Sequence, residues 1–145
     1  MSISLHAQER FDNETRVNRI LFILDASGSM KTEWDGSDRY KIATRLLSKV
    51  VDSIEKVDRN VEFALRVYGH QSHRSLKNCK DSRLEVPFGK YNSANITSKL
   101  GELKPQGHTP IAYSIHQSLQ DFPYDPYAKN AIVLITDGLE NCGGD

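Results

Sequence analysis

The sequence lacks an excess of charge of either sign, and it lacks any long hydrophobic run. Its 19 Lys and Arg residues balance 19 Asp and Glu residues, so the formal net charge is zero. This balance gives no reason to expect binding to nucleic acid or to an anionic membrane surface. Even the apolar run at residues 20–24 is far shorter than the roughly 18 residues that a membrane-spanning helix requires. We therefore expect no nucleic-acid partner and no membrane span.

Cysteine is also scarce, and the sequence has no internal repeat and no low-complexity segment. Its two cysteines are Cys79 and Cys142. Hydrophobic residues make up 38% of the 145 residues and charged residues make up 26%, which is typical of a folded globular chain. A chain of this length is expected to form one domain around one core.

Strands and helices are predicted to alternate along the chain. Apolar runs or alternation of apolar and polar residues indicate strands, and apolar residues at every third or fourth position indicate helices. The predicted elements are a strand at 20–24, a helix at 38–56, strands at 61–68 and 84–88, helices at 93–103 and 110–119, and a strand at 131–136. This order indicates an α/β fold with a mostly parallel sheet flanked by helices.

Several details follow from the same pattern. The first and last strands are continuous apolar runs, so we expect both to be buried on both faces. Pro87 places the strand at 84–88 on an edge of the sheet. Ser37 or Asp38 is available to cap the first helix, and Thr109 is expected to cap the last one. Residues 69–83 have no periodicity and are expected to form a long loop.

Residues 1–18 form an N-terminal extension before the first predicted strand. Ile3, Leu5 and Ala7 fit the end of a cleaved export signal whose apolar centre would precede this sequence. A frayed terminus that begins with the initiator Met is the alternative.

Two carboxylates and three hydroxyls are expected at one edge of the sheet. Asp25 and Asp137 each follow an apolar strand, Ser27 and Ser29 come directly after Asp25, and Thr109 precedes a helix. Ligands of parallel α/β sheets bind beyond the carboxyl ends of the strands. A site with only oxygen ligands and few carboxylates favours Mg²⁺ over a Ca²⁺ cage with more carboxylates. The sequence therefore predicts a magnesium site at this edge.

At these residues the sequence resembles the von Willebrand factor type A (VWA) domain family. The D-x-S-x-S motif of that family matches residues 25–29, which read DASGS and continue with Met30. The isolated threonine of the second motif matches Thr109 in GHTPI, and the third motif matches Asp137 in LITDG. The order, the spacing and the strand context agree from about residue 19 onward.

The resemblance implies a Rossmann-like sheet over residues 19–145 with a metal-ion-dependent adhesion site at its top. Such a site holds Mg²⁺ or Mn²⁺, with Ca²⁺ less favoured. Ser27 and Ser29 would be direct ligands, and Asp25, Thr109 and Asp137 would bind directly or through water. The remaining position would take an Asp or Glu carboxylate of a partner protein. The implied function is metal-dependent adhesion or assembly without catalysis.

The resemblance also favours a disulfide between Cys79 and Cys142, since bacterial members of the family have similar cysteine-containing segments. A disulfide is typical of an exported protein, so it would favour a periplasmic or cell-surface location. Two reduced cysteines in a cytoplasmic protein are the alternative.

Other interpretations of the same residues remain open. Asp25, Thr109 and Asp137 could serve only in turns and caps. A regulatory VWA module of a chelatase or of an AAA-ATPase chaperone system would use the same site to dock an enzyme subunit. A hydrolase using Ser27 is a weaker alternative, because DASGS does not match the G-x-S-x-G nucleophile elbow. His70, His73 and Cys79 have a spacing compatible with zinc, or belong to a solvated loop.

The resemblance to the family ends after the strand at 131–136. The sheet of a VWA domain normally continues with further strands and helices, so we expect a domain that is incomplete at its C-terminus. An open sheet edge exposes unpaired backbone groups and apolar surface. Association through this edge is therefore expected.

Overall fold

The computed structural model describes residues 16–143 of the protein. The predicted remnant of an export signal at Ile3, Leu5 and Ala7 lies outside these residues. Among residues 16–143, no helix is both long enough and apolar enough to cross a lipid bilayer.

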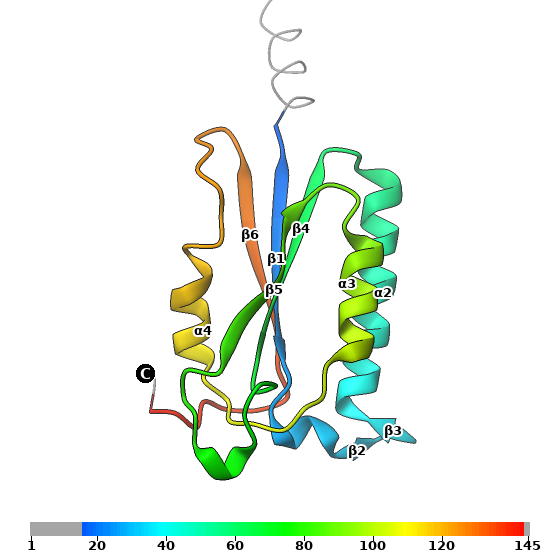
Figure 1. Ribbon diagram of the computed structural model, residues 1–145. Coiled ribbons are helices and arrows are strands. Elements are labelled where there is room, and N and C mark those ends of the chain that lie inside the picture. Colours follow the sequence, from blue (N-terminus) through cyan, green and yellow to red (C-terminus); the bar gives the residue numbers. More distant parts are fainter. Residues whose placement is uncertain (1–15, 144–145) are drawn as a thin grey trace, which may run out of the picture.

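A four-stranded sheet forms the centre of the molecule, with the order β5-β4-β1-β6 (Figure 1). β1 is parallel to both of its neighbours, whereas β5 runs antiparallel to β4 and occupies an edge. The prediction of a mostly parallel sheet with the Pro87 strand at its edge is confirmed. The strands are β1 (Asn18–Asp25), β4 (Val61–Tyr68), β5 (Ser82–Gly89) and β6 (Lys129–Ile135).

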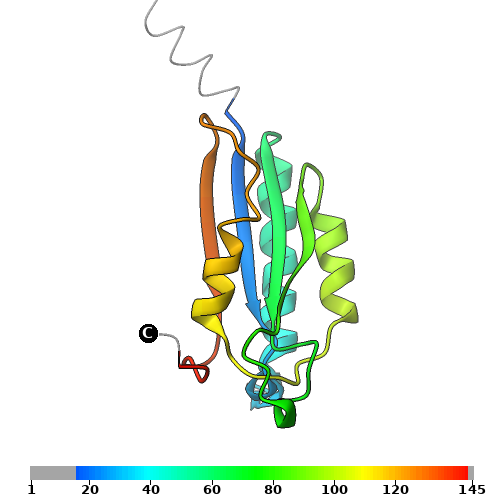
Figure 2. The ribbon, with the colours of Figure 1, turned by 60° about the vertical axis from the view of Figure 1, so that its left-hand side comes forward.

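Helices cover both faces of this sheet. α2 (Arg39–Val57) and α3 (Ser93–Glu102) lie against one face, and α4 (Ile111–Ser118) lies against the other (Figures 1 and 2). The Asp38 side chain accepts a hydrogen bond from the Lys41 amide, so it caps α2 as expected.

The core divides into two layers because alternate residues of a strand point to opposite faces of a sheet. Phe22 and Leu24 of β1 face α2 and α3, where Phe22 also packs against Phe63 with ring centroids 5.8 Å apart. Leu21 and Ile23 face α4, and their layer includes the buried Tyr68. Because both faces of β1 are covered, residues 21–24 of its apolar run are buried, as the sequence predicted, while Ile20 at the start of the run is partly buried.

β6 differs from the prediction, which expected it to be buried on both faces. Ile132, Val133 and Leu134 are 37%, 40% and 37% exposed. Within residues 16–143, β6 is an edge strand that pairs only with β1. An apolar groove of about 440 Å³ separates the end of this strand from α2, and Leu46 and Ile135 lie on its two walls. The run is apolar enough for burial, but the described residues provide no second strand beside β6, and its central side chains stay more than a third exposed.

The prediction from the sequence also did not include a short hairpin between β1 and α2. β2 (Glu33–Trp34) and β3 (Ser37–Asp38) pair antiparallel around Asp35 and Gly36, both of which have positive φ. An Asp-Gly pair with positive φ at both positions is the signature of a type I′ hairpin turn, so the signal was present in the sequence.

Candidate metal centre

Asp25 lies at the carboxyl end of β1 and is completely buried. One of its carboxylate oxygens, Oδ1, accepts a hydrogen bond of 2.8 Å from the Ser27 amide. The other, Oδ2, accepts a hydrogen bond of 2.8 Å from the Thr136 hydroxyl at the end of β6. Asp25 therefore joins the ends of two adjacent parallel strands, and this places Asp25 and Asp137 at the same edge of the sheet.

Ser27, Ser29 and Asp137 form a continuous chain of oxygen atoms beside Asp25. Ser29 belongs to the short 3-10 helix η1 (Gly28–Lys31), which begins directly after Ser27. The two serine hydroxyls are 3.1 Å apart, and Ser29 Oγ donates to Asp137 Oδ1 at 3.0 Å. The structure thus brings together four of the five predicted ligands, although they come from segments more than 100 residues apart.

Asp137 also forms an ion pair with Arg39, the first residue of α2. Arg39 Nη1 donates to Asp137 Oδ2 at 2.7 Å, while Asp137 Oδ1 faces Ser29. The Asp137 side chain is 11% exposed, and that of Arg39 is 37% exposed. The guanidinium therefore neutralises one of the two carboxylates and leaves the other side of Asp137 directed at the serines.

The spacing of these oxygens fits an octahedral ion. Two neighbouring ligands bound at about 2.0 to 2.1 Å to an octahedral Mg²⁺ lie about 2.9 Å from each other. The two separations along the Ser27, Ser29 and Asp137 chain are 3.1 and 3.0 Å. This donor set has hard oxygen atoms and little formal charge, which also suits Mg²⁺ or Mn²⁺.

Tyr68 supplies a second observation at the same place. It pairs with Asp25 in the register of β1 and β4, and within residues 16–143 its buried hydroxyl has no hydrogen-bond partner. Burial raises the pKa of Tyr68 above its ordinary value of 10.0, and the Asp25 carboxylate raises it further. A buried hydroxyl without a partner beside a carboxylate is compatible with a site at which an ion or its water completes the hydrogen bonding.

Thr109, the fifth predicted ligand, lies on the loop that runs alongside residues 26–28. Gly28 donates to Gly107 O at 2.9 Å, and Gly107 donates to Gly69 O at 2.7 Å, so this loop, the start of η1 and the end of β4 are in direct contact. A Cβ on Gly69 would lie 2.6 Å from the His108 oxygen, and its φ of +74° also requires glycine. Thr109 is 5% exposed, and its hydroxyl is not hydrogen-bonded to the other four candidates within the described residues.

Thr109 does not cap α4, which corrects the prediction. The N-cap position is Pro110, which has no side-chain cap. Instead the Glu140 carboxylate, from the segment after β6, accepts a hydrogen bond of 2.9 Å from the Ala112 amide in the first turn. A carboxylate at this place satisfies a free amide and interacts favourably with the helix dipole.

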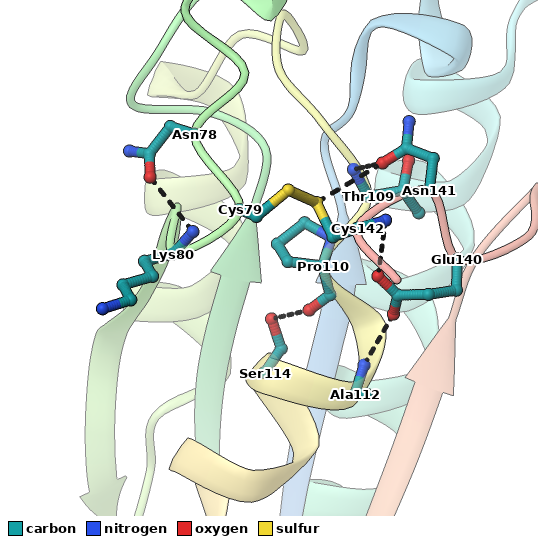
Figure 3. Close-up of a disulfide and its surroundings, with 10 residues drawn as sticks. All are labelled: Asn78, Cys79, Lys80, Thr109, Pro110, Ala112, Ser114, Glu140, Asn141 and Cys142. Atoms are coloured by element: carbon teal, nitrogen blue, oxygen red, sulfur yellow. Dashed lines mark hydrogen bonds between the residues drawn. A yellow bond between two sulfur atoms is a disulfide. The ribbon is translucent and has the colours of Figure 1, made fainter. Parts of the chain in front are cut away.

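A disulfide joins Cys79 to Cys142, with the two Cα atoms 5.5 Å apart (Figure 3). It connects the loop between β4 and β5 to the segment that follows Asp137. The disulfide that the resemblance favoured is therefore present in the structure.

Two of the alternatives, a zinc site and a hydrolase, find no support in the geometry. Cys79 is in the disulfide, His70 Nε2 lies 2.6 Å from Glu85 Oε1, and His73 bonds to Ser75, so these residues do not assemble a zinc site. In the described part of the chain, the hydrogen-bond partner of the Ser27 hydroxyl is Ser29, whereas a hydrolase would place a histidine there.

Sequence reasoning missed four residues that shape the site. Thr136 precedes Asp137 directly, so its place at the end of an apolar strand was a usable signal. Arg39, Glu140 and Asn141 carried no such signal, because each acts on a residue distant in the sequence.

Comparison with known proteins agrees with this fold and these motifs. The family model for the von Willebrand factor type A domain matches residues 20–140. Uncharacterized protein YwmD of Bacillus subtilis (strain 168) is 34% identical over 149 residues. That alignment covers 99% of this chain but 63% of YwmD, so the chain spans less than two thirds of that relative's length.

Two solved structures show the same fold. The pilus adhesin SpaC from Lactobacillus rhamnosus GG superposes with a TM-score of 0.70 at 20% identity, over 87% of this chain and 16% of SpaC. An aerotolerance-related membrane protein from Bacteroides fragilis NCTC 9343 superposes with a TM-score of 0.69 at 26% identity, over 87% of this chain and 57% of that protein. From the family match, the three motifs and the sheet, we conclude that this chain belongs to the von Willebrand factor type A domain family.

Proposed function

We propose that this domain is a protein-binding module that coordinates Mg²⁺ or Mn²⁺ and, through the ion, an Asp or Glu side chain of a partner. The observation that carries the proposal is the chain of oxygens from Ser27 through Ser29 to Asp137, with separations of 3.1 and 3.0 Å. These residues would hold the ion together with Asp25 and Thr109. When bound, the ion would provide a Lewis-acidic position for a carboxylate oxygen.

The charge of the site supports an acidic partner. Asp25 and Asp137 contribute two negative charges, and Arg39 offsets one of them through its 2.7 Å contact with Asp137. A divalent ion would therefore leave the site with a net positive charge. Such a site attracts a carboxylate and repels a cation, so it fits the binding of an acidic partner in adhesion or assembly.

We also propose that the domain acts outside the cytoplasm, in the periplasm or at the cell surface. The Cys79–Cys142 disulfide supports this location, because such bonds persist in oxidising compartments. A pilus adhesin is among the structures with the same fold. A count of two free thiols on unreduced, unfolded protein from native cells would contradict the proposal.

Calorimetric titration tests the metal site. Mg²⁺ and Mn²⁺ should bind to the native protein, whereas Asp25→Ala and the exposed Ser29→Ala should each lose most of the binding. Asp52→Ala is the matched control, since Asp52 is a 56% exposed carboxylate of α2 that pairs with Lys56. Equal binding by all four proteins would show that the site is assigned wrongly.

Capture of partners with and without a chelator tests the binding role. A partner that is retained in Mg²⁺ and released by chelator should also fail to bind Ser29→Ala. Replacing its contacting Asp or Glu with Asn or Gln should abolish retention. If the retained protein is a subunit of an ATPase or chelatase, the domain is a regulatory module instead of an adhesin.

A further inference from the structure

The segment that follows Asp137 is attached to the rest of the domain at three points. Figure 3 shows that Glu140, Asn141 and Cys142 each contact a different part of the chain. We call these three residues the clasp. Because the clasp begins three residues after Asp137 and contacts Thr109, it connects two of the predicted metal ligands that come from different loops.

Asn141 forms hydrogen bonds with both the main-chain amide and the main-chain carbonyl of Thr109. The side-chain oxygen Oδ1 of Asn141 accepts a hydrogen bond of 2.8 Å from the Thr109 main-chain amide. The main-chain amide of Asn141 donates to Thr109 O at 3.4 Å. Thr109 is 5% exposed, while Asn141 lies on the surface. The exposed Asn141 thus holds the nearly buried Thr109 through the main chain of Thr109. These contacts do not use the Thr109 hydroxyl.

Glu140 holds the helix that follows Thr109. Its Oε2 accepts from the Ala112 amide at 2.9 Å, and its Oε1 accepts from the Cys142 amide at 2.9 Å. The carboxylate therefore ties the first turn of α4 to the clasp itself. Asn141 attaches to Thr109 and Glu140 attaches to Ala112, three residues later, so the position of Thr109 relative to Asp137 is restricted by both contacts.

Cys142 anchors the clasp covalently. Its disulfide to Cys79 links it to the loop between β4 and β5, and the same loop contacts the Thr109 loop through the Gly107 and Gly69 hydrogen bond of 2.7 Å. The clasp is consequently held at its end by a bond that does not break when the nearby loops fluctuate.

From this geometry we infer that Asn141 is a positioning residue for the metal site, which acts by holding Thr109 at a set place relative to Asp137. The disulfide keeps Asn141 in reach of Thr109. The inference rests on the proposed metal-binding function and names residues that control the affinity of that site. Contacts that orient metal ligands without touching the ion typically change metal affinity by about ten-fold to a hundred-fold when removed.

Three variants test the role of the clasp. Asn141→Ala removes the acceptor of the Thr109 amide, and Asn141→Asp retains an oxygen at the same place. The double variant Cys79→Ser with Cys142→Ser removes the covalent anchor. Asn78→Ala is the matched control, because Asn78 lies beside Cys79 but bonds to Lys80 and Ser72 at 3.0 Å each, not to the clasp.

Two measurements are made on each protein: Mg²⁺ affinity by calorimetry, and hydrogen exchange of the Thr109 amide by NMR without metal. We expect Asn141→Ala and the double cysteine variant to weaken Mg²⁺ binding by roughly ten-fold and to speed exchange at Thr109. Asn141→Asp should retain slow exchange at Thr109 and Mg²⁺ binding, and Asn78→Ala should behave as the native protein.

The outcomes separate this inference from the proposed function. No Mg²⁺ binding by the native protein would overturn the proposed function and the inference together. Native binding with equal affinity in Asn141→Ala would overturn the inference alone. A weaker affinity with unchanged exchange at Thr109 would also overturn it, because the effect would then not pass through the Thr109 backbone.

Discussion

β1 and β6 are adjacent parallel strands that look alike in sequence, because each is a short apolar run that ends in an acid-containing motif. In the structure Leu21 of β1 is fully buried, whereas its partner in the register, Ile132 of β6, is 37% exposed. β1 has a strand on each side and helices over both faces. β6 pairs only with β1 among the described residues, and an apolar groove lies between its end and α2.

The difference shows that an apolar run specifies a strand but not the extent of its burial. Burial depends on what covers the strand, and those neighbours come from elsewhere in the chain. It follows that the β1 side of the domain is stabilised mainly by packing. The β6 side depends more on specific attachments, which are the Asp25 and Thr136 hydrogen bond of 2.8 Å, the Asp137 contacts and the disulfide.

The largest effect is expected from removing the disulfide. Cys79→Ser with Cys142→Ser frees a loop whose ends are 63 residues apart in the sequence. In the chain-entropy model the free energy of unfolding should fall by about 4 kcal/mol. Denaturant unfolding of the native and double-variant proteins measures the change. A loss below about 1 kcal/mol would mean that the packing of the β6 side needs no covalent support.

A matched pair of leucines tests the comparison directly. Leu21→Ala in β1 should lower the free energy of unfolding by about 3 kcal/mol, because it leaves a cavity in a fully covered layer. Leu134→Ala in β6 should cost about 1 kcal/mol or less, because Leu134 is 37% exposed and solvent already reaches it. Equal losses in denaturant unfolding would indicate that something covers β6 in solution.

The stability of the β1 side should also be the more sensitive to alkaline pH. Tyr40 of α2 donates a hydrogen bond of 2.9 Å to Leu100 O, and burial together with Asp38 raises the pKa of Tyr40 above its ordinary 10.0. Above pH 10 the unfolded chain loses this proton while the folded chain keeps it, so stability falls as pH rises. The slope for this group is about 1.4 kcal/mol per pH unit. Unfolding measured from pH 9 to 11 should show a shallower fall in Tyr40→Phe than in the native protein. Parallel pH profiles would contradict this assignment.

The smallest effect on stability is expected for a charged residue introduced into β6. The property measured for this variant is self-association. Val133 is 40% exposed, so Val133→Lys should change the free energy of unfolding by roughly 0.5 kcal/mol or less. A lysine on an exposed edge strand opposes edge-to-edge pairing. Sedimentation should show concentration-dependent association of the native protein and less of it in Val133→Lys. A native protein that stays monomeric at all concentrations would remove the reason to regard β6 as a contact surface.

Much of the site could be predicted because its motifs are local. The positions of Asp25, Ser27 and Ser29 follow from a strand that ends and a chain that turns tightly, and Asp137 lies at the same sheet edge because parallel strands end together. The cap of α4 could not be predicted in this way. Thr109 has the right residue type for a cap, but Glu140 takes that role from a segment that only the fold brings near.

By itself the sequence determined the α/β class, the order of the elements, the edge position of β5 and the ends of β1 and β6 where the candidate oxygen ligands lie. These features depend on the period of apolar residues, on Pro87 and on short motifs, all of which act over a few residues. Only the tertiary structure decided that β6 is exposed, that Arg39 neutralises Asp137 and that Asn141 holds Thr109. Each of these depends on which distant segments meet, and a local pattern carries no information about that.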